Sequence, residues 1–173
     1  MQPGPTLLTQ AQIRARVRQL GRSITRHYQG KRPLFLGIMN GALCFLADLL
    51  RAVDLDSEVS CVRLASYVGA KSTGKLRGLE AMGDSFQGRH VLIVDDIFDT
   101  GHTLAGVIQR LRELGAAEVK VCVLLQKKKG QIPVQVDWVG FKIPDAFVVG
   151  YGLDYNGRYR GLKQIRVLET PAV

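Results

Sequence analysis

Short apolar runs alternate with amphipathic stretches along the first 125 residues of the chain. Runs rich in β-branched residues predict four strands that are buried on both faces, at Leu34 to Ile38, Val59 to Leu64, Val91 to Val94 and Val119 to Leu125. Apolar residues at 3.6-residue spacing predict helices over about 9–28, 43–53 and 104–114. Because strands and helices take turns, we expect an α/β fold with a central, twisted parallel sheet and helices on both faces.

The two ends of the chain follow a different pattern. Residues 1–8 show no periodicity and are expected to be loose, whereas Thr9 and Gln12 form a capping box that starts the first helix. Further short strands are predicted at Val134 to Phe141, Phe147 to Gly150 and Ile165 to Leu168. Without a repeat or a linker, we expect one domain over residues 1–173, with a core at about 31–140 and a small hood from about 1–30 and 141–173.

A glycine-rich stretch interrupts the alternation of strands and helices. Residues 67–88 hold five glycines and few large apolar side chains, and a long loop inside a compact domain usually has a function. Within it, Gly69 to Lys75 has the spacing of a Walker A phosphate loop, but Leu76 stands where Ser or Thr must bind Mg²⁺. We therefore interpret this stretch as a flexible loop and not as a nucleotide cradle of that kind.

Composition narrows the class of protein without identifying it. The 173 residues are 46% hydrophobic and 23% charged, and the net charge of +9 suits anionic ligands, either pyrophosphate or nucleic acid. Six arginines carry much of the excess, and we expect them on the solvated face of a helix instead of in a nucleic-acid patch. They are Arg14, Arg16, Arg18, Arg22, Arg26 and Arg32.

Cysteine usage and hydropathy point to a location in the cell. The three cysteines lie in apolar runs and have no zinc-site spacing, which favours small buried side chains in a reducing compartment. The N-terminus lacks a signal pattern, and the longest charge-free run, Pro33 to Ala47, is too short and too polar to span a bilayer. We expect a cytoplasmic protein.

Candidate chemistry gathers at the end of the strand that starts at Val91. Asp95 and Asp96 follow this strand, a loop with one Gly and two Thr comes next, and then an amphipathic helix begins. Open α/β sheets bind ligands outside the carboxyl ends of their strands, and helix N-termini attract phosphate. The pattern therefore predicts a 5′-phosphate site on residues 99–103, with Asp95 and Asp96 beside the hydroxyls of an attached ribose. An ordinary strand with two capping aspartates is the alternative, although paired carboxylates without partners repel each other.

The thirteen positions from Val91 to Thr103 resemble the phosphoribosyl-diphosphate (PRPP) signature of the type I phosphoribosyltransferases. Two further segments are similar to the hypoxanthine-guanine branch of that family. Ser66 and Tyr67 open a stretch like its flexible catalytic loop, and residues 140–155 with 159–162 look like its purine-site segment. The resemblance covers roughly residues 34–168 and implies the type I phosphoribosyltransferase fold.

For PRPP, the resemblance implies a role for each matching residue. Asp95 and Asp96 hold the ribose hydroxyls, and Asp99 is the general base. The 5′-phosphate is bound by Thr100, Gly101, His102 and Thr103. Pyrophosphate is bound by Met39, Asn40 and Gly41, where the family often has a cis non-proline peptide, and by Arg160. Asn40 departs from the Lys or Arg that is common in relatives, and His102 from Lys, Asn or Ser.

For the purine and the metal, the resemblance implies a second set of roles. Phe147 stacks on the purine, the Val148 backbone reads its edge, and Lys127 donates to the 6-oxo group, with Lys128 and Lys129 as rivals. Asp154 lies near the 2-position of the base and organises Mg²⁺. Asp95, Asp96 and Asp154 are the metal set, and Ser66 with Tyr67 belongs to the closing lid. Individually, Phe147 also suits a core, Arg160 a surface charge and Asp154 a turn.

The implied activity is purine salvage, the Mg²⁺-dependent transfer of ribose 5-phosphate from PRPP to hypoxanthine or guanine. Its products are IMP or GMP and pyrophosphate. One alternative is a regulator on the same fold that senses PRPP or a nucleotide and binds nucleic acid. Another is transfer to xanthine, adenine or a pyrimidine, of which a Lys127 donor disfavours adenine and leaves xanthine open. The family further implies a homo-oligomer, either a dimer or a tetramer.

Overall fold

A computed structural model of the chain describes residues 2–63, 86–127 and 134–169. Ser66, Tyr67, the Walker-like segment and the rest of the glycine-rich stretch up to residue 85 lie outside the described residues, as do Lys128 and Lys129. No helix among the residues described is long and apolar enough to cross a membrane.

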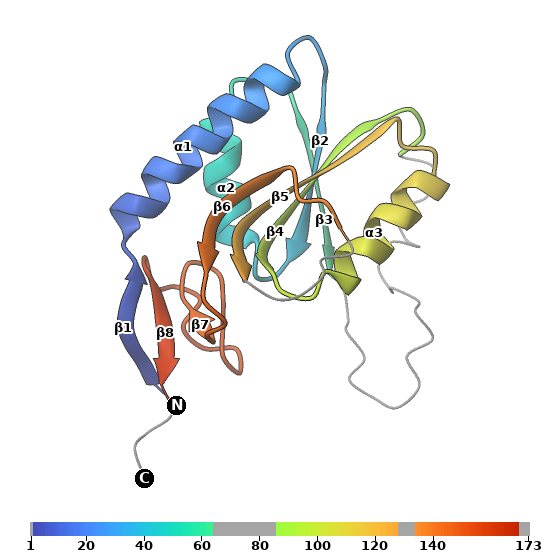
Figure 1. The fold of residues 1–173 in the computed structure, drawn as a ribbon. Coiled ribbons are helices and arrows are strands. Elements are labelled where there is room, and N and C mark those ends of the chain that lie inside the picture. The colour runs from blue at the N-terminus through green and yellow to red at the C-terminus, as the bar shows by residue number, and fades with distance from the viewer. Residues whose placement is uncertain (1, 64–85, 128–133, 170–173) are drawn as a thin grey trace, which may run out of the picture.

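A five-stranded parallel sheet forms the centre of the molecule (Figure 1). Its order is β3 (Glu58–Arg63), β2 (Leu34–Met39), β4 (His90–Phe98), β5 (Glu118–Lys127) and β6 (Trp138–Ile143). The chain builds β3 on one side of β2 and then returns to place β4 on the other side. The carboxyl ends of β2 and β4 therefore border a topological switch point, where open α/β sheets bind ligands.

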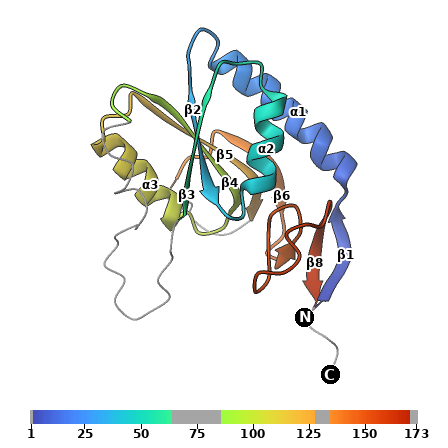
Figure 2. The ribbon, with the colours of Figure 1, turned by 180° about the vertical axis from the view of Figure 1, so that it is seen from behind.

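Helices cover both faces of this sheet, as the alternating pattern predicts. The helices α1 (Gln10–His27) and α2 (Leu43–Ala52) lie on one face and α3 (His102–Glu113) on the other (Figures 1 and 2). Side chains alternate between two cores, so Phe35 and Leu92 pack with α1 and α2, whereas Leu36 and Ile93 pack with α3. Burial on both faces explains why these strands read as continuous apolar runs.

A small antiparallel sheet corrects the prediction for the N-terminus. Its order is β1 (Gln2–Leu8), β8 (Ile165–Glu169) and β7 (Val148–Val149), so residues 2–8 form a strand and are not loose. The sequence pattern did not predict this strand because it contains Pro3, Gly4 and Pro5, and proline usually interrupts the hydrogen-bond ladder of a sheet. Here β1 is an edge strand with irregular register that pairs with β8 alone, and an edge tolerates proline because one side needs no donors.

Other boundaries differ in smaller ways. The strand β4 runs on through both aspartates to Phe98, and β6 begins at Trp138, four residues later than predicted. Before β6, the Asp137 carboxylate accepts hydrogen bonds from the backbone N–H of Val121 at 2.9 Å and from Lys120 Nζ at 2.8 Å. A side chain thus takes a position that a backbone carbonyl has in a regular ladder.

The first helix is held at its start and along one side. Thr9 forms the predicted capping box, in which its N–H donates to Gln12 Oε1 at 2.8 Å. Arg16 donates to the backbone oxygens of Gly140 and Val139, both at 2.8 Å. Placing Arg16 on a solvated face was therefore wrong, because its guanidinium ties α1 to β6.

Gly21 sets the close approach of α1 to α2. A methyl group at this position would overlap the backbone oxygen of Ala52, the last residue of α2. Helix propensity alone favours Gly21→Ala by about 1 kcal/mol, but overpacking typically costs about 1–3 kcal/mol.

We therefore expect Gly21→Ala to lower the free energy of unfolding, measured by urea denaturation. Gly161→Ala is the control, since it has open space around it and should gain about 0.4–1 kcal/mol. A more stable Gly21→Ala would contradict the packing argument.

Candidate active site

Three segments meet at the switch point between β2 and β4. Gly41 follows β2 and lies so close to Asp96 of β4 that a side chain on Gly41 would overlap the carboxylate. On its other side, Gly152 has a φ of +103° and contacts the backbone oxygen of Gly41. The peptide between Met39 and Asn40 is cis. These contacts bring the predicted pyrophosphate loop, the paired aspartates and the loop between β7 and β8 together.

The paired aspartates lie at the edge of the core. Asp95 is the one buried charged residue among the residues described, with 9% of its surface exposed. Burial raises the pKa of its carboxyl well above the usual range, and the neighbouring Asp96 raises it further. Burial also raises the pKa of Asp96, against the opposing hydrogen bond from the Ile97 N–H at 3.0 Å and the charge of Arg160. Such a pair gains from ligands that donate hydrogen bonds or bring positive charge.

The predicted phosphate loop ends in a helix N-terminus without a side-chain cap. Gly101 is the N-cap of α3 with a φ of 85°, a left-handed conformation that favours glycine. The first turn of α3 carries no acidic residue, and Thr100, His102 and Thr103 are exposed. The loop therefore presents backbone N–H groups, two hydroxyls and the positive end of a helix dipole to solvent, as an anion site requires.

Lys127 joins the ends of three neighbouring strands. Its Nζ lies 3.4 Å from Asp99 Oδ2, after β4, and 3.1 Å from Asp145 Oδ1, after β6. The lysine side chain is only 12% exposed. Asp99 and Lys127 were predicted as site residues and are brought together, whereas Asp145 was missed. Asp145 follows shortly after β6, which lies next to β5, and this position near the carboxyl end of a strand could have indicated a site residue.

Phe147 lies on the surface, as a stacking platform requires. Its side chain is 54% exposed and makes an edge contact with Tyr155, with ring centroids 5.7 Å apart. Val148 is buried in β7 and pairs with Val167 of β8. Phe147 is therefore not a core residue, and Tyr155, which the sequence did not single out, supports it.

Arg160 and Asp154 hold the loop between β7 and β8 in shape. Arg160 donates to the Gly152 backbone oxygen at 2.6 Å and forms an ion pair of 2.6 Å with Asp154. Asp154 also accepts from the Gly157 N–H at 2.7 Å. No three His, Cys, Asp or Glu side chains form a ready metal site in the described part of the chain. Asp95, Asp96 and Asp154 are thus not preassembled as a three-carboxylate cage.

Comparison with known proteins shows the family to which the chain belongs. The model of the phosphoribosyl transferase domain matches residues 6–156. The hypoxanthine-guanine phosphoribosyltransferase of Bacillus subtilis is 40% identical over 169 residues, which cover 96% of this chain and 93% of that protein. The crystal structure of a hypoxanthine phosphoribosyltransferase from Staphylococcus aureus superimposes with a TM-score of 0.90 at 35% identity, covering 96% of this chain and 92% of that one.

Some relatives are much longer than this chain. The bifunctional TilS/HprT protein of Listeria monocytogenes is 38% identical over 165 residues, and the match spans 94% of this chain but 26% of that protein. The family match nevertheless covers most of this chain, and the fold agrees with it. The chain belongs to the hypoxanthine-guanine phosphoribosyltransferases of the type I phosphoribosyltransferase family.

Proposed function

We propose that the chain catalyses the Mg²⁺-dependent transfer of ribose 5-phosphate from PRPP to N9 of hypoxanthine or guanine. The products are IMP or GMP and pyrophosphate. One observation carries the choice of a 6-oxopurine. Lys127, a hydrogen-bond donor, lies between Asp99 and Asp145, and Asp145 is two residues from the exposed ring of Phe147. A donor, a base and a stacking surface are what recognition of such a purine needs.

The PRPP end of the site follows from the switch-point geometry. We propose that Asp95 and Asp96 accept hydrogen bonds from the ribose hydroxyls, which would relieve the repulsion of two buried carboxylates. Residues 100–103 would bind the 5′-phosphate at the N-terminus of α3. The tight packing of Gly41 between Asp96 and Gly152 supports a pyrophosphate loop that binds through backbone, so Asn40 in place of a basic residue costs little.

The reaction centre lies at the ends of β4 and β5. Asp99 would accept the proton from the purine ring as the new bond to the ribose forms, and general-base help is typically worth about 10²–10⁴ in rate. Lys127 would donate to the 6-oxo group, and its two carboxylate contacts hold it ready near the base. Phe147 would stack on the purine, and the Val148 backbone would read its edge. Arg160 would turn its guanidinium toward the leaving pyrophosphate.

The residues present fit Mg²⁺ as a shared ligand of protein and substrate. Mg²⁺ prefers oxygen ligands and usually binds one or two carboxylates together with substrate phosphates, which agrees with the lack of a preassembled cage among the described residues. Asp95, Asp96 and Asp154 are the carboxylates that we propose for it. When bound, Mg²⁺ would neutralise charge on the leaving pyrophosphate.

Several finer features are part of the proposal. The residues from 1 to 173 would act as one domain, with the β1–β8–β7 sheet in the hood, and as a homo-oligomer in the cytoplasm. Xanthine remains a possible base, since a 36% identical relative from Tritrichomonas foetus is named a hypoxanthine-guanine-xanthine phosphoribosyltransferase. The nucleic-acid-binding regulator is not favoured, because the compared relatives carry enzyme names.

Pyrophosphate release tests the proposed function directly. The purified chain is given PRPP and Mg²⁺ with hypoxanthine, guanine, xanthine, adenine or uracil in separate reactions. We expect release with hypoxanthine and guanine that EDTA abolishes, and little with adenine, because Lys127 donates and adenine presents an amine at position 6. If none of the five bases supports pyrophosphate release, the proposed transferase activity is refuted. If only adenine or only uracil supports release, the assignment of a 6-oxopurine substrate is refuted.

Asp99→Asn should separate binding from chemistry. The amide keeps the shape of the side chain but cannot take a proton, so we expect kcat to fall by about 10²–10⁴, with the Kd for PRPP nearly unchanged in calorimetry. Asp145→Asn is the matched control, because it removes the other carboxylate beside Lys127. A half-exposed ion pair is worth about 0–1 kcal/mol, so kcat should fall less than about sixfold. Equal losses in both variants would show that Asp99 acts only through Lys127.

Asp95→Asn should improve stability and impair PRPP binding. A carboxyl whose pKa is raised by folding holds its proton more tightly in the folded chain, so stability falls as the pH rises above about 4. Removing this ionisation should make the variant more stable than wild type at pH 8. Each unit of pKa elevation corresponds to about 1.4 kcal/mol.

Urea denaturation at several pH values measures this gain, which should shrink as the pH falls toward 4. The Kd for PRPP should rise about fivefold or more, because hydrogen bonds to a charged acceptor are stronger by about 1 kcal/mol. Asp54→Asn, at an exposed carboxylate, should change stability by less than about 0.5 kcal/mol. If the Asp95→Asn protein is less stable than wild type at pH 8, the argument that the buried charge of Asp95 destabilises the fold is wrong.

A further inference from the structure

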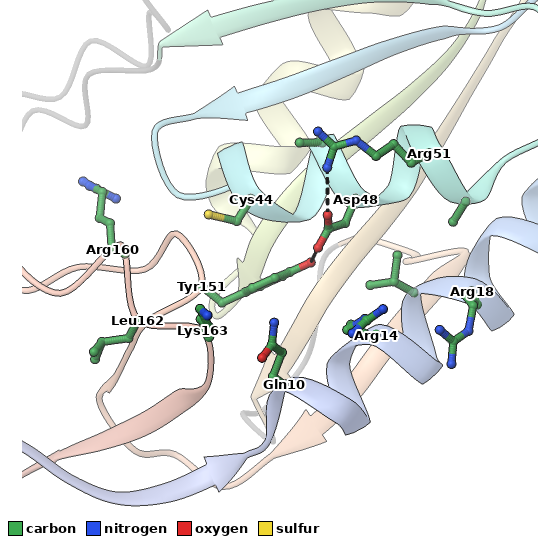
Figure 3. Close-up of a pocket in the computed structure, with 14 residues that line it drawn as sticks. Gln10, Arg14, Arg18, Cys44, Asp48, Arg51, Tyr151, Arg160, Leu162 and Lys163 are labelled. Carbon is green, nitrogen blue, oxygen red and sulfur yellow. Dashed lines mark hydrogen bonds and ion pairs between the residues drawn. The ribbon is translucent and has the colours of Figure 1, made fainter.

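A second pocket lies between α1, α2 and the loop after β7 (Figure 3). Its volume is about 520 Å³, within the range of small-molecule sites, about 300–1,000 Å³. Neither the paired aspartates nor Asp99, Lys127 or Phe147 lines it. It borders the candidate active site at Cys44 and at the loop that carries Tyr151 and Arg160, and the rest of its lining comes from α1, α2 and residues 161–163.

The charge around this pocket is strongly positive. Five of its lining side chains are basic and one is acidic. The basic ones are Arg14, Arg18, Arg51, Arg160 and Lys163. The single carboxylate, Asp48, already accepts from the Tyr151 hydroxyl at 2.6 Å and from Arg51 at 3.3 Å. Burial raises the pKa of Tyr151, which keeps this hydroxyl protonated as a donor.

Three of the cations form no ion pair with any residue that the structure describes. The helix α1 contains no acidic residue, and none of the ion pairs within the described ranges involves Arg14, Arg18 or Lys163. Figure 3 shows Arg14 and Arg18 projecting from α1, with Arg51 on α2 across from them. Like charges that line one pocket repel each other, and an anion bound between them relieves this repulsion.

The lining of the pocket also includes apolar side chains. They are Val17 of α1, Ala47 of α2 and Leu162 of the loop. A lining that combines several basic side chains with apolar ones suits a compact ligand with several negative charges and a less polar body. Guanidinium groups match phosphate oxygens with paired hydrogen bonds, and several of them together exceed what one carboxylate can satisfy.

We propose that this pocket is a second anion site, which binds a polyphosphate, either free or carried by a nucleotide. It is distinct from the proposed PRPP site and does not depend on the proposed reaction. Arg160 borders both sites, because it lines the pocket and holds Gly152 and Asp154 of the loop. The two anions would therefore lie on opposite sides of one loop.

Calorimetric titration with inorganic tripolyphosphate tests the proposal. Three full-length proteins are compared: wild type, Arg14→Gln with Arg18→Gln, and Arg22→Gln with Arg26→Gln. The last pair is the matched control, because Arg22 and Arg26 are exposed on the same helix at the same spacing but do not line the pocket. Each pair removes two charges. Binding at the PRPP site is common to all three proteins and cancels from the comparison.

We expect the pocket pair to weaken the binding of tripolyphosphate at least about tenfold, because charge-assisted hydrogen bonds to phosphate are roughly twice as strong as neutral ones. The control pair should stay within about twofold, since distant exposed charges are screened by salt. Equal weakening in both variants, or none in either, would overturn the proposal. Adenosine triphosphate as a second probe separates the two sources: tighter binding than tripolyphosphate supports a nucleotide, and equal binding supports recognition of the polyphosphate alone.

Sedimentation velocity of the same proteins excludes another use of this face. If the pocket pair changes the oligomeric state while tripolyphosphate affinity stays the same, the pocket is covered by a second copy of the chain and the proposal is wrong. A chain without transferase activity would still permit the whole comparison. Failure of the anion site and failure of the proposed function are therefore distinguishable.

Discussion

Two adjacent carboxylates at the end of a buried strand are the constraint on which the rest of the site depends. The core strand β4 carries Asp95 and Asp96 to a position where burial disfavours their charged forms. Neighbouring segments then adapt to them. Ile97 donates its N–H to Asp96, and only a residue without a side chain fits at position 41. The arrangement costs stability in the free protein, which is expected where a site must be ready for hydroxyl groups or a cation.

The parallel sheet explains why so few residues bring so much chemistry together. Strands β4, β5 and β6 are neighbours with the same direction, so Asp99, Lys127 and Asp145 emerge at one edge although they are far apart in sequence. The lysine contacts one oxygen of each carboxylate in the free protein. A substrate with an oxygen acceptor can take over part of that hydrogen bonding without any strand moving, because the contacts of 3.1 and 3.4 Å are long for strong ion pairs.

The features that could be predicted from sequence are those with a local signal. Apolar runs indicate the buried parallel strands, and Thr9 with Gln12 indicates the start of a helix. The segment after Val91 carries acidic, glycine and hydroxyl residues at fixed spacing. What escaped prediction depends on distant pairing. The strand β1 forms by pairing with β8, from Gln2 opposite Glu169 to Leu8 opposite Ile165, and nothing near Pro3 or Pro5 indicates that partner. Asp145 is similar, since it becomes a site residue only through a lysine that is eighteen positions earlier.

The basic side chains of the protein have different roles that depend on where the fold places them. Arg16 donates a hydrogen bond that links α1 to β6. Arg32 and Arg89 both form ion pairs with Glu58, at the end of the sheet opposite the candidate active site. Arg160 shapes a loop. After these are assigned, the exposed arginines of α1 remain, and helix geometry orders them, because residues four apart rise about 6 Å and stay on one side. Of this row, Arg14 and Arg18 line the pocket between α1 and α2, and Arg22 and Arg26 do not. Net charge therefore says little about a ligand until the fold decides which cations face a cavity together.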